Sequence, residues 1–299
     1  MRFGIREICN VVFKATTKRT IGGKSFEAGQ PVIYFDSLKT STMEQATTTV
    51  YAQGGRGNTR LVAWEGEKTL TFTMEDALIS EMGLAILAGA NLFRADDGEK
   101  DTLVVHVTET ISDAKVSKLP SVAEGIKFYA LEMNDSGDIS GDPIEVTIAK
   151  EATEGKYAVE AVEVKEGETQ PSIETNKVYL VDYYTDKKTG ATQIDIEPSC
   201  LGGNFYIEAD TLFRDTLGAD HAAQFIIPNG KVQSNFTFTM ASSGDPSTFT
   251  FTVDAFPGYV NGDKTKKVLS AIQIVDDTDI TVSVNDPAGD LEDSKPSVK

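Results

Sequence analysis

The sequence has 299 residues, of which 40% are hydrophobic, with 28 basic and 46 acidic side chains and a net charge of -18. This length fits one elaborated domain or two, and the apolar fraction is sufficient for a hydrophobic core. The acidic balance argues against general affinity for DNA, RNA or anionic lipid, because binding to polyanions requires a dense basic surface. Only a local basic patch is compatible with this charge.

The amino-terminal stretch MRFGIREICNVVFKA has no continuous apolar segment of signal-peptide length. No segment of the sequence approaches the roughly 20 apolar residues that cross a bilayer. Cys9 and Cys200 lie far apart and fit no metal-ligand spacing, so we interpret them as buried thiols of a protein matured in a reducing compartment. We expect synthesis in the host cytoplasm and no membrane partner.

The amino-terminal region is dominated by period-two alternation of apolar and polar residues, which is typical of β-strands. Strand-like runs rich in β-branched and aromatic residues are NVVFKAT, PVIYFDSL, TRLVAW and KTLTFTM. A long hairpin is expected over residues 40–64, with strand up to Tyr51, a glycine-rich tip, and strand again from Arg60.

The tip of this hairpin, YAQGGRGNTR, holds three glycines and two arginines in ten residues. It is no Walker loop, because no lysine follows the glycines and the next element is a strand rather than a helix. Two interpretations stay open: a mobile surface loop, or a self-association element. In the second, Arg56 and Arg60 pair with carboxylates of a neighbouring copy, and the repeated contact builds rings or filaments.

One stretch, TMEDALISEMGLAILAGAN (73–91), has helical rather than strand periodicity. Apolar residues recur on one face, and Thr73 with Asp76 resembles a capping box. Gly89 stands where the helix is expected to end. We predict one helix here, with its apolar stripe packed against a sheet.

Strand-like runs return through the rest of the chain and predict a mostly antiparallel sandwich or barrel. These runs are KDTLVVHVTE, GIKFYALEM, PIEVTIAK, KYAVEAVEV, KVYLVDYYT, TQIDIE, NFYIEADTLF, AQFIIPNGKV, SNFTFTM, STFTFTVDAF and VLSAIQIVD.

Charge and turn residues divide the chain. Residues 1–106 have a net charge of -1, whereas residues 107–190 have -8 and residues 191–299 have -9. We interpret 107–190 as an immunoglobulin-like insertion into a domain built from 1–106 and 191–285, followed by a flexible tail at 286–299.

Groups suited to catalysis or metal binding are scarce. His106 lies within a strand-like run, and His221 lies in the loop GADHAAQ, where no metal motif is present. The acidic stretches DDTD and NDSGDISGD are interpreted as solvated turns rather than calcium loops. We expect no enzyme activity, no catalytic residue, no bound metal and no cofactor.

The hairpin with its long loop, the helix EDALISEMGLAILAGA, and the carboxy-terminal run FIIPNGKVQSNFTFTMASSGDPSTFTFTVDAFPG together resemble the tail tube, or major tail, proteins of bacteriophages. The resemblance covers roughly residues 1–105 and 191–285 and rests on the order of elements rather than on an invariant motif. It implies a mainly β fold, with an antiparallel barrel or sandwich, one flanking helix and an inserted immunoglobulin-like sandwich.

The resemblance also implies a structural role in the virion tail. Subunits would form stacked, hexameric rings, and the loop at 41–64 would contact the next ring. In that interpretation the contact residues are Tyr51, Arg56, Arg60 and Trp64. Implied partners are other copies of the chain, a sheath or terminator protein, and a tape measure inside the tube. Genomic DNA would pass through without specific binding, because an acidic inner surface repels phosphate.

Two other classes of protein are compatible with the same pattern. One is another phage structural component, such as a capsid decoration protein or a tube-like baseplate protein, which differs only in assembly geometry. The other is an enzyme or carbohydrate-binding β-sandwich, although the single tryptophan, Trp64, is sparse for a sugar-stacking surface.

Overall fold

The computed structural model describes residues 2–89, 91–95, 102–164, 170–198, 202–237, 240, 242–243 and 247–275. The fold is mainly β with one described helix, which confirms the expected fold class. The chain divides into two compact units, the first built from residues 1–91 and 195–299 and the second from residues 92–194.

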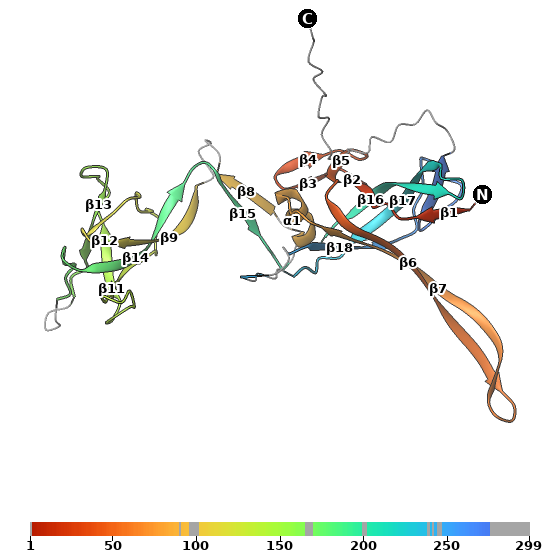
Figure 1. The fold of residues 1–299 in the computed structure, drawn as a ribbon, viewed down its shortest axis with the longest axis horizontal. Helices are drawn as coiled ribbons and strands as arrows, with labels where there is room; N and C mark the ends of the chain where they lie inside the picture. The colour runs from red at the N-terminus through yellow and green to blue at the C-terminus, as the bar shows by residue number, and fades with distance from the viewer. Residues whose placement is uncertain are drawn as a thin grey trace, which may run out of the picture. The chain divides into compact units, whose positions relative to one another are not determined.

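The first unit is built on a nine-stranded antiparallel sheet (Figure 1), in the order β5-β2-β16-β17-β18-β7-β6, with β1 paired to β16 and β19 to β17. Its strands are β1 (Phe3–Ile5), β2 (Asn10–Ala15), β5 (Pro31–Phe35), β6 (Leu38–Gly54), β7 (Thr59–Asp76), β16 (Asn204–Asp215), β17 (Asp220–Val232), β18 (Phe249–Ala255) and β19 (Ala271–Val275). A small separate hairpin joins β3 (Arg19–Ile21) to β4 (Lys24–Phe26). The amino- and carboxy-terminal parts of the chain therefore share one sheet.

The core of this unit is formed by side chains that alternate along the strands. On β2 and β16 every second residue is buried, which is the pattern of a sheet with one covered face. Aromatic rings interlock at the centre: the Phe35 and Phe251 centroids are 4.8 Å apart in an edge-on arrangement, and those of Phe13 and Phe35 are 5.3 Å apart. The alternation that predicted the strands thus also determines which residues fill the core.

The helix α1 (Glu81–Ala88) is shorter than predicted and begins later. Thr73 and Asp76 belong to β7, so the expected capping box is wrong; the side chain of Ser80 caps the helix instead, accepting a 2.9 Å hydrogen bond from the backbone N–H of Gly83. Gly89 ends the helix in the left-handed conformation, with φ 62°, as predicted. Among the residues that the structure describes, no helix has the length and apolar character needed to cross a membrane.

Two further strand predictions need correction, and three other features of the sequence lie outside the described residues. The separate runs TRLVAW and KTLTFTM are one continuous strand, β7. The run SNFTFTM does not form a strand at its described positions, 234–237 and 240. The stretch DDTD, the tail at 286–299 and Cys200 lie outside the described residues.

The second unit contains a six-stranded sheet in the order β10-β13-β12-β11-β14-β9, and a two-stranded sheet of β8 and β15. Its strands are β8 (Asn91–Ala95), β9 (Leu103–Ile111), β10 (Lys115–Val116), β11 (Phe128–Met133), β12 (Ile144–Ile148), β13 (Tyr157–Ala161), β14 (Val178–Lys187) and β15 (Ala191–Asp195). Tyr179, Val181 and Tyr183 of β14 lie at the centre of a separate hydrophobic core. That this unit is immunoglobulin-like stays a prediction.

Candidate functional site

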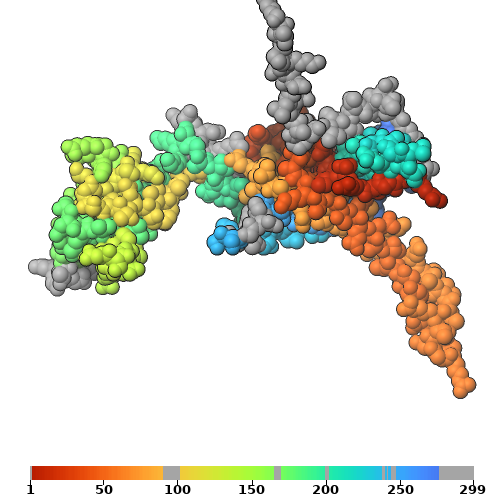
Figure 2. Space-filling model, viewed as in Figure 1, coloured from red at the N-terminus to blue at the C-terminus, as the bar shows by residue number. Residues whose placement is uncertain are grey.

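The hairpin β6–β7 extends far beyond the sheet that holds its base (Figure 1). The two strands pair from Leu38 opposite Asp76 out to Gly54 opposite Thr59, whereas β18 pairs with β7 only along residues 71–76. We call residues 46–69 the arm and its outer part, residues 50–64, the distal arm. Figure 2 shows the arm as a tapering projection of the first unit. Nearly all its residues are exposed, so the arm has no core of its own.

The tip of the arm is a tight turn that places Arg56 at its apex. The backbone N–H of Asn58 donates a 3.1 Å hydrogen bond to the carbonyl of Gly55, closing the turn. Gly57 has φ 95°, a conformation that side chains strongly disfavour, so the glycine content of the tip serves backbone geometry. This agrees with the exclusion of a phosphate loop from the sequence.

One face of the distal arm is apolar. Val50 lies directly opposite Trp64 and Ala52 directly opposite Val62, and side chains at such paired positions point to the same side of a ribbon. Val50 is 63% exposed and Trp64 55%. Leu61, at a shift in the strand register, adds a further exposed aliphatic side chain. The arm thus carries an apolar strip that nothing in its own unit covers among the described residues.

The opposite face is polar and cationic. Tyr51 lies opposite Ala63, one step out of phase with the apolar strip. The guanidinium carbon of Arg60 lies 4.0 Å from the centroid of the Tyr51 ring, a cation–π contact that holds the arginine along the ribbon. The distal arm contains Arg56 and Arg60 and no acidic residue, so it is locally basic in an acidic chain.

A bulge within the arm separates the distal arm from the part of the hairpin nearer the sheet. Between Thr47 opposite Lys68 and Thr49 opposite Glu65 the register shifts. There the hydroxyl of Thr48 accepts a 2.9 Å hydrogen bond from the backbone N–H of Glu67. A Cβ at Gly66 would lie 2.6 Å from that hydroxyl oxygen, so a side chain there would displace the Thr48 hydroxyl. Bulges of this kind increase twist and redirect a strand pair.

The four residues singled out from the sequence all lie on the distal arm, but not on one face. Tyr51 and Arg60 are in contact, Arg56 is at the apex, and Trp64 is on the opposite face. Their role in contacts between subunits stays a prediction. Sequence reasoning missed Val50, Leu61 and Val62; their signal was an apolar run, LVAW, in a hairpin too long for the sheet.

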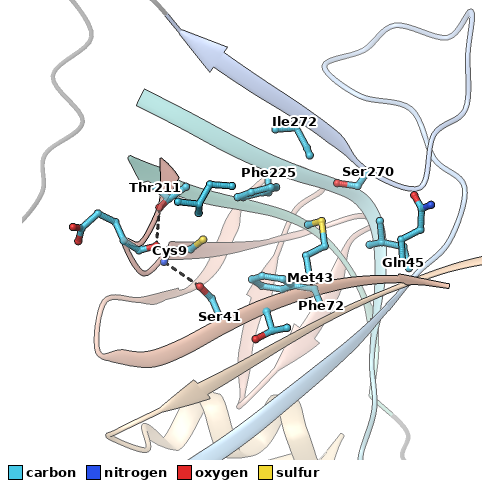
Figure 3. A pocket seen from close by; sticks show the side chains of 13 residues that line it. Cys9, Ser41, Met43, Gln45, Phe72, Thr211, Phe225, Ser270 and Ile272 are labelled. Atoms are coloured by element: carbon cyan, nitrogen blue, oxygen red, sulfur yellow. Dashed lines mark hydrogen bonds between the residues drawn. The ribbon is translucent and has the colours of Figure 1, made fainter. Parts of the chain in front are cut away.

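A groove of about 550 Å³ lies at the base of the same hairpin (Figure 3). Met43 and Phe72 approach it from the hairpin, and Phe225 of β17 and Ile272 of β19 from the other side. Its lining residues are Ile5, Glu7, Cys9, Ser41, Thr42, Met43, Gln45, Leu70, Phe72, Thr211, Phe225, Ser270 and Ile272. Apolar side chains form most of this surface.

Two hydrogen bonds close one end of the groove. The Cys9 backbone N–H donates to the Ser41 hydroxyl at 3.3 Å, and the Thr211 hydroxyl donates to the Glu7 carbonyl at 3.0 Å. Burial raises the pKa of the Cys9 thiol, which disfavours the reactive thiolate. Cys9 is therefore suited to packing rather than to nucleophilic chemistry, as the sequence indicated.

The two histidines have ordinary structural partners. His106 is exposed on β9, with Nε2 2.7 Å from a carboxylate oxygen of Asp182 on the neighbouring strand β14. His221, expected in a loop, lies instead on strand β17 beside Phe3, with Nε2 3.4 Å from a carboxylate oxygen of Asp215. Within the described ranges, no group of three or more His, Cys, Asp or Glu side chains is arranged to hold a metal ion.

Comparison with known proteins supplies the family. No curated protein matches the sequence. A family model described as the YomU/Tube protein family matches residues 12–271, which include the arm and the whole of the second unit. The resemblance to phage tube proteins is thereby confirmed at the level of the family. Because the match spans well over half of the 299 residues, the chain belongs to the YomU/Tube protein family and is a tube-type structural component of a phage tail.

Proposed function

We propose that this protein assembles with copies of itself into stacked, hexameric rings that form the tail tube through which phage DNA passes. The observation that carries the proposal is the arm, a paired ribbon with an apolar strip that lies outside any core of its own unit. Two-stranded ribbons are marginal in water on their own, so an extended arm of this kind calls for a binding partner.

Burial of the exposed apolar side chains of the distal arm favours self-association. Burying one large apolar side chain contributes about 1.5–3 kcal/mol, so Val50, Val62 and Trp64 together offer a strong driving force at each repeated contact. Arg56 at the apex adds a cation that suits the acidic surface of another copy, since the chain as a whole carries -18. A heterologous contact of this kind repeats along an axis.

The remaining parts of the proposal rest on the acidic charge of the chain and on its resemblance to tail tube proteins. An acidic tube wall repels the phosphate backbone, which lets DNA slide through without specific binding. The protein performs no reaction and needs no cofactor in this role. A sheath or terminator protein at the tube surface and a tape measure within it are its further partners.

Electron microscopy of the purified protein tests this function. We expect hollow tubes of uniform diameter, with six-fold symmetry in end views, and their loss when Val50 and Trp64 are both replaced by serine. Growth of normal tubes by this double variant would contradict the role of the arm.

The alternative is a capsid decoration or baseplate protein, because a β-rich subunit of that kind would show the same pattern of strands. It predicts a discrete trimer or monomer that coats capsids or joins a baseplate. Analytical ultracentrifugation over a wide concentration range separates a closed oligomer from open-ended growth.

A further inference from the structure

The groove at the base of the hairpin is an apolar surface that lacks a partner among the described residues. Leu70 and Phe72 form its floor and belong to the hydrophobic core. At its edge, Ile5 of β1 is 65% exposed and Ile272 of β19 is 57% exposed. Apolar side chains that converge on an open groove are typical of a binding surface.

Edge strands flank this groove. In the described sheet β6 is the last strand, β1 pairs only with β16, and β19 pairs only with β17. Backbone groups on such edges are available to another chain, and the apolar lining supplies the burial that stabilises the contact. The groove is therefore suited to receive an extended polypeptide segment.

The molecule's own arm does not reach its own groove. Met43, which lines the groove, and Val50, in the apolar strip, lie on the same continuous strand β6. Seven residues of strand correspond to about 23 Å at about 3.3 Å per residue, and the pairing with β7 keeps the ribbon extended. A distal arm that fills the groove therefore comes from another copy.

The distal arm has the chemistry that the groove requires. It presents Val50, Val62 and Trp64 along one face, against an apolar floor. It also carries two arginines without an acidic residue, whereas the groove has the exposed carboxylate of Glu7 at its mouth and the whole chain is strongly acidic. Apolar and charge complementarity therefore point to the same occupant.

We propose that the groove of one copy is the receiving site for the distal arm of the next copy. This inference rests on the proposed self-assembly and adds the surface that the arm contacts. Since arm and groove are different surfaces of the same subunit, each copy that receives an arm extends its own, and the contact propagates.

The test uses two complementary variants of the full chain. The groove variant Ile272→Arg places a charge in the receiving site and keeps Trp64. The arm variant, Val50→Ser with Trp64→Ser, keeps the groove and lacks the chain's only tryptophan. Both sites are exposed in the monomer, so both variants are expected to fold, which circular dichroism melting checks.

Neither variant alone forms tubes, because each lacks one half of the contact. On mixing, the arm of the groove variant enters the groove of the arm variant, and the emission of Trp64 shifts to the blue as the indole leaves water. Growth stops at short complexes, because every further contact needs a second functional surface.

The control is Gln273→Arg, which adds the same charge on the same strand with its side chain on the opposite face. It is expected to form tubes like the wild type; loss of tubes here would remove the assignment to the groove. Normal tubes from Ile272→Arg, or an unshifted Trp64 emission in the mixture, would overturn the groove while leaving arm-driven assembly intact. Normal tubes from the arm variant would instead refute the proposed function itself.

Discussion

The inner and outer halves of the β6–β7 hairpin are made by the same two strands, yet their apolar side chains face different surroundings. In the inner half, formed by residues 38–45 and 70–76, Phe72 and Met74 are buried in the core of the first unit. In the outer half, Val50 and Trp64 stand exposed. Apolar side chains therefore have two uses in one hairpin, folding at its base and, in our proposal, assembly at its end.

The largest effect on stability is expected from a substitution in the inner half of the hairpin. Replacing Phe72, which is 2% exposed, by alanine removes a buried ring that packs with the core. We expect the free energy of unfolding to fall by about 3–5 kcal/mol, since truncation of buried aromatic side chains leaves a cavity. Urea denaturation of the unassembled protein measures this change, and a loss below 1 kcal/mol, roughly the size of a surface effect, would contradict the burial.

The matching change in the outer half should impair tube growth while leaving the free energy of unfolding nearly unchanged. The Val50→Ser and Trp64→Ser double variant is expected to change the free energy of unfolding by less than about 0.5 kcal/mol, because both side chains are exposed. Tubes should be absent at concentrations where the wild type assembles, because losing a buried aromatic anchor in an interface should raise the concentration needed for growth at least about thirtyfold. Sedimentation of tubes across a concentration series measures it. Equal effects on stability and assembly would contradict the division of roles.

Charge on the distal arm is expected to matter next. Replacing Arg56 and Arg60 by glutamate should leave the subunit folded and abolish tube growth, because repulsion replaces attraction at every repeated contact with an acidic copy. For the wild type, growth should slow as salt rises, since exposed charges are screened. Negative-stain microscopy and light scattering record both. Arg60→Lys is the matched control, because it keeps the charge while altering the stacking on Tyr51.

The stability of the second unit is expected to depend on pH, because its core contains a titratable side chain. Burial, followed by the hydrogen bond from its hydroxyl to Glu109, raises the pKa of Tyr183 to about 12 from its ordinary value of 10.0. The folded state thus holds this proton more tightly than the unfolded state. Its contribution to stability is fully present below pH 10 and is lost as the pH rises through about 12. Melting of wild type and Tyr183→Phe across this window should show a steeper fall for the wild type; identical slopes would contradict the shift.

The smallest effect on assembly is expected from removing the second unit. Replacing residues 96–190 by a short glycine–serine linker leaves the first unit with its own core, and its arm and groove unchanged. We expect tubes to form, with less density per subunit in averaged images. A soluble, folded variant that makes no tubes would mean that the second unit contributes to subunit contacts.

Local patterns in the sequence were sufficient for several elements. Alternation marked most strands, and the glycine-rich tip marked the hairpin, because the turn needs positive φ at Gly57. Gly89 marked the end of the helix for the same reason. The start of the helix was predicted too early. Thr73 and Asp76 have the spacing of a capping box, and the sequence alone does not show that both belong to strand β7.

Other features depended on contacts between distant residues. The pairing of β2 with β16 joins segments from the two ends of the chain, and no local pattern specifies which strand a strand will choose. The groove likewise requires β1, β6, β17 and β19 to meet. The contact between Arg60 and Tyr51 depends on a register shift near the tip that spacing alone does not reveal.

The sequence by itself determined the β-rich character, the hairpin and the acidic charge, because these depend on neighbouring residues and on composition. Only the tertiary structure decided which apolar side chains of the hairpin are buried and which are exposed. Phe72 and Trp64 belong to the same kind of pattern, and they differ because β18 and the core cover one end of the hairpin and leave the other in solvent. Burial is a property of the surrounding strands, and those strands are brought in from elsewhere in the chain.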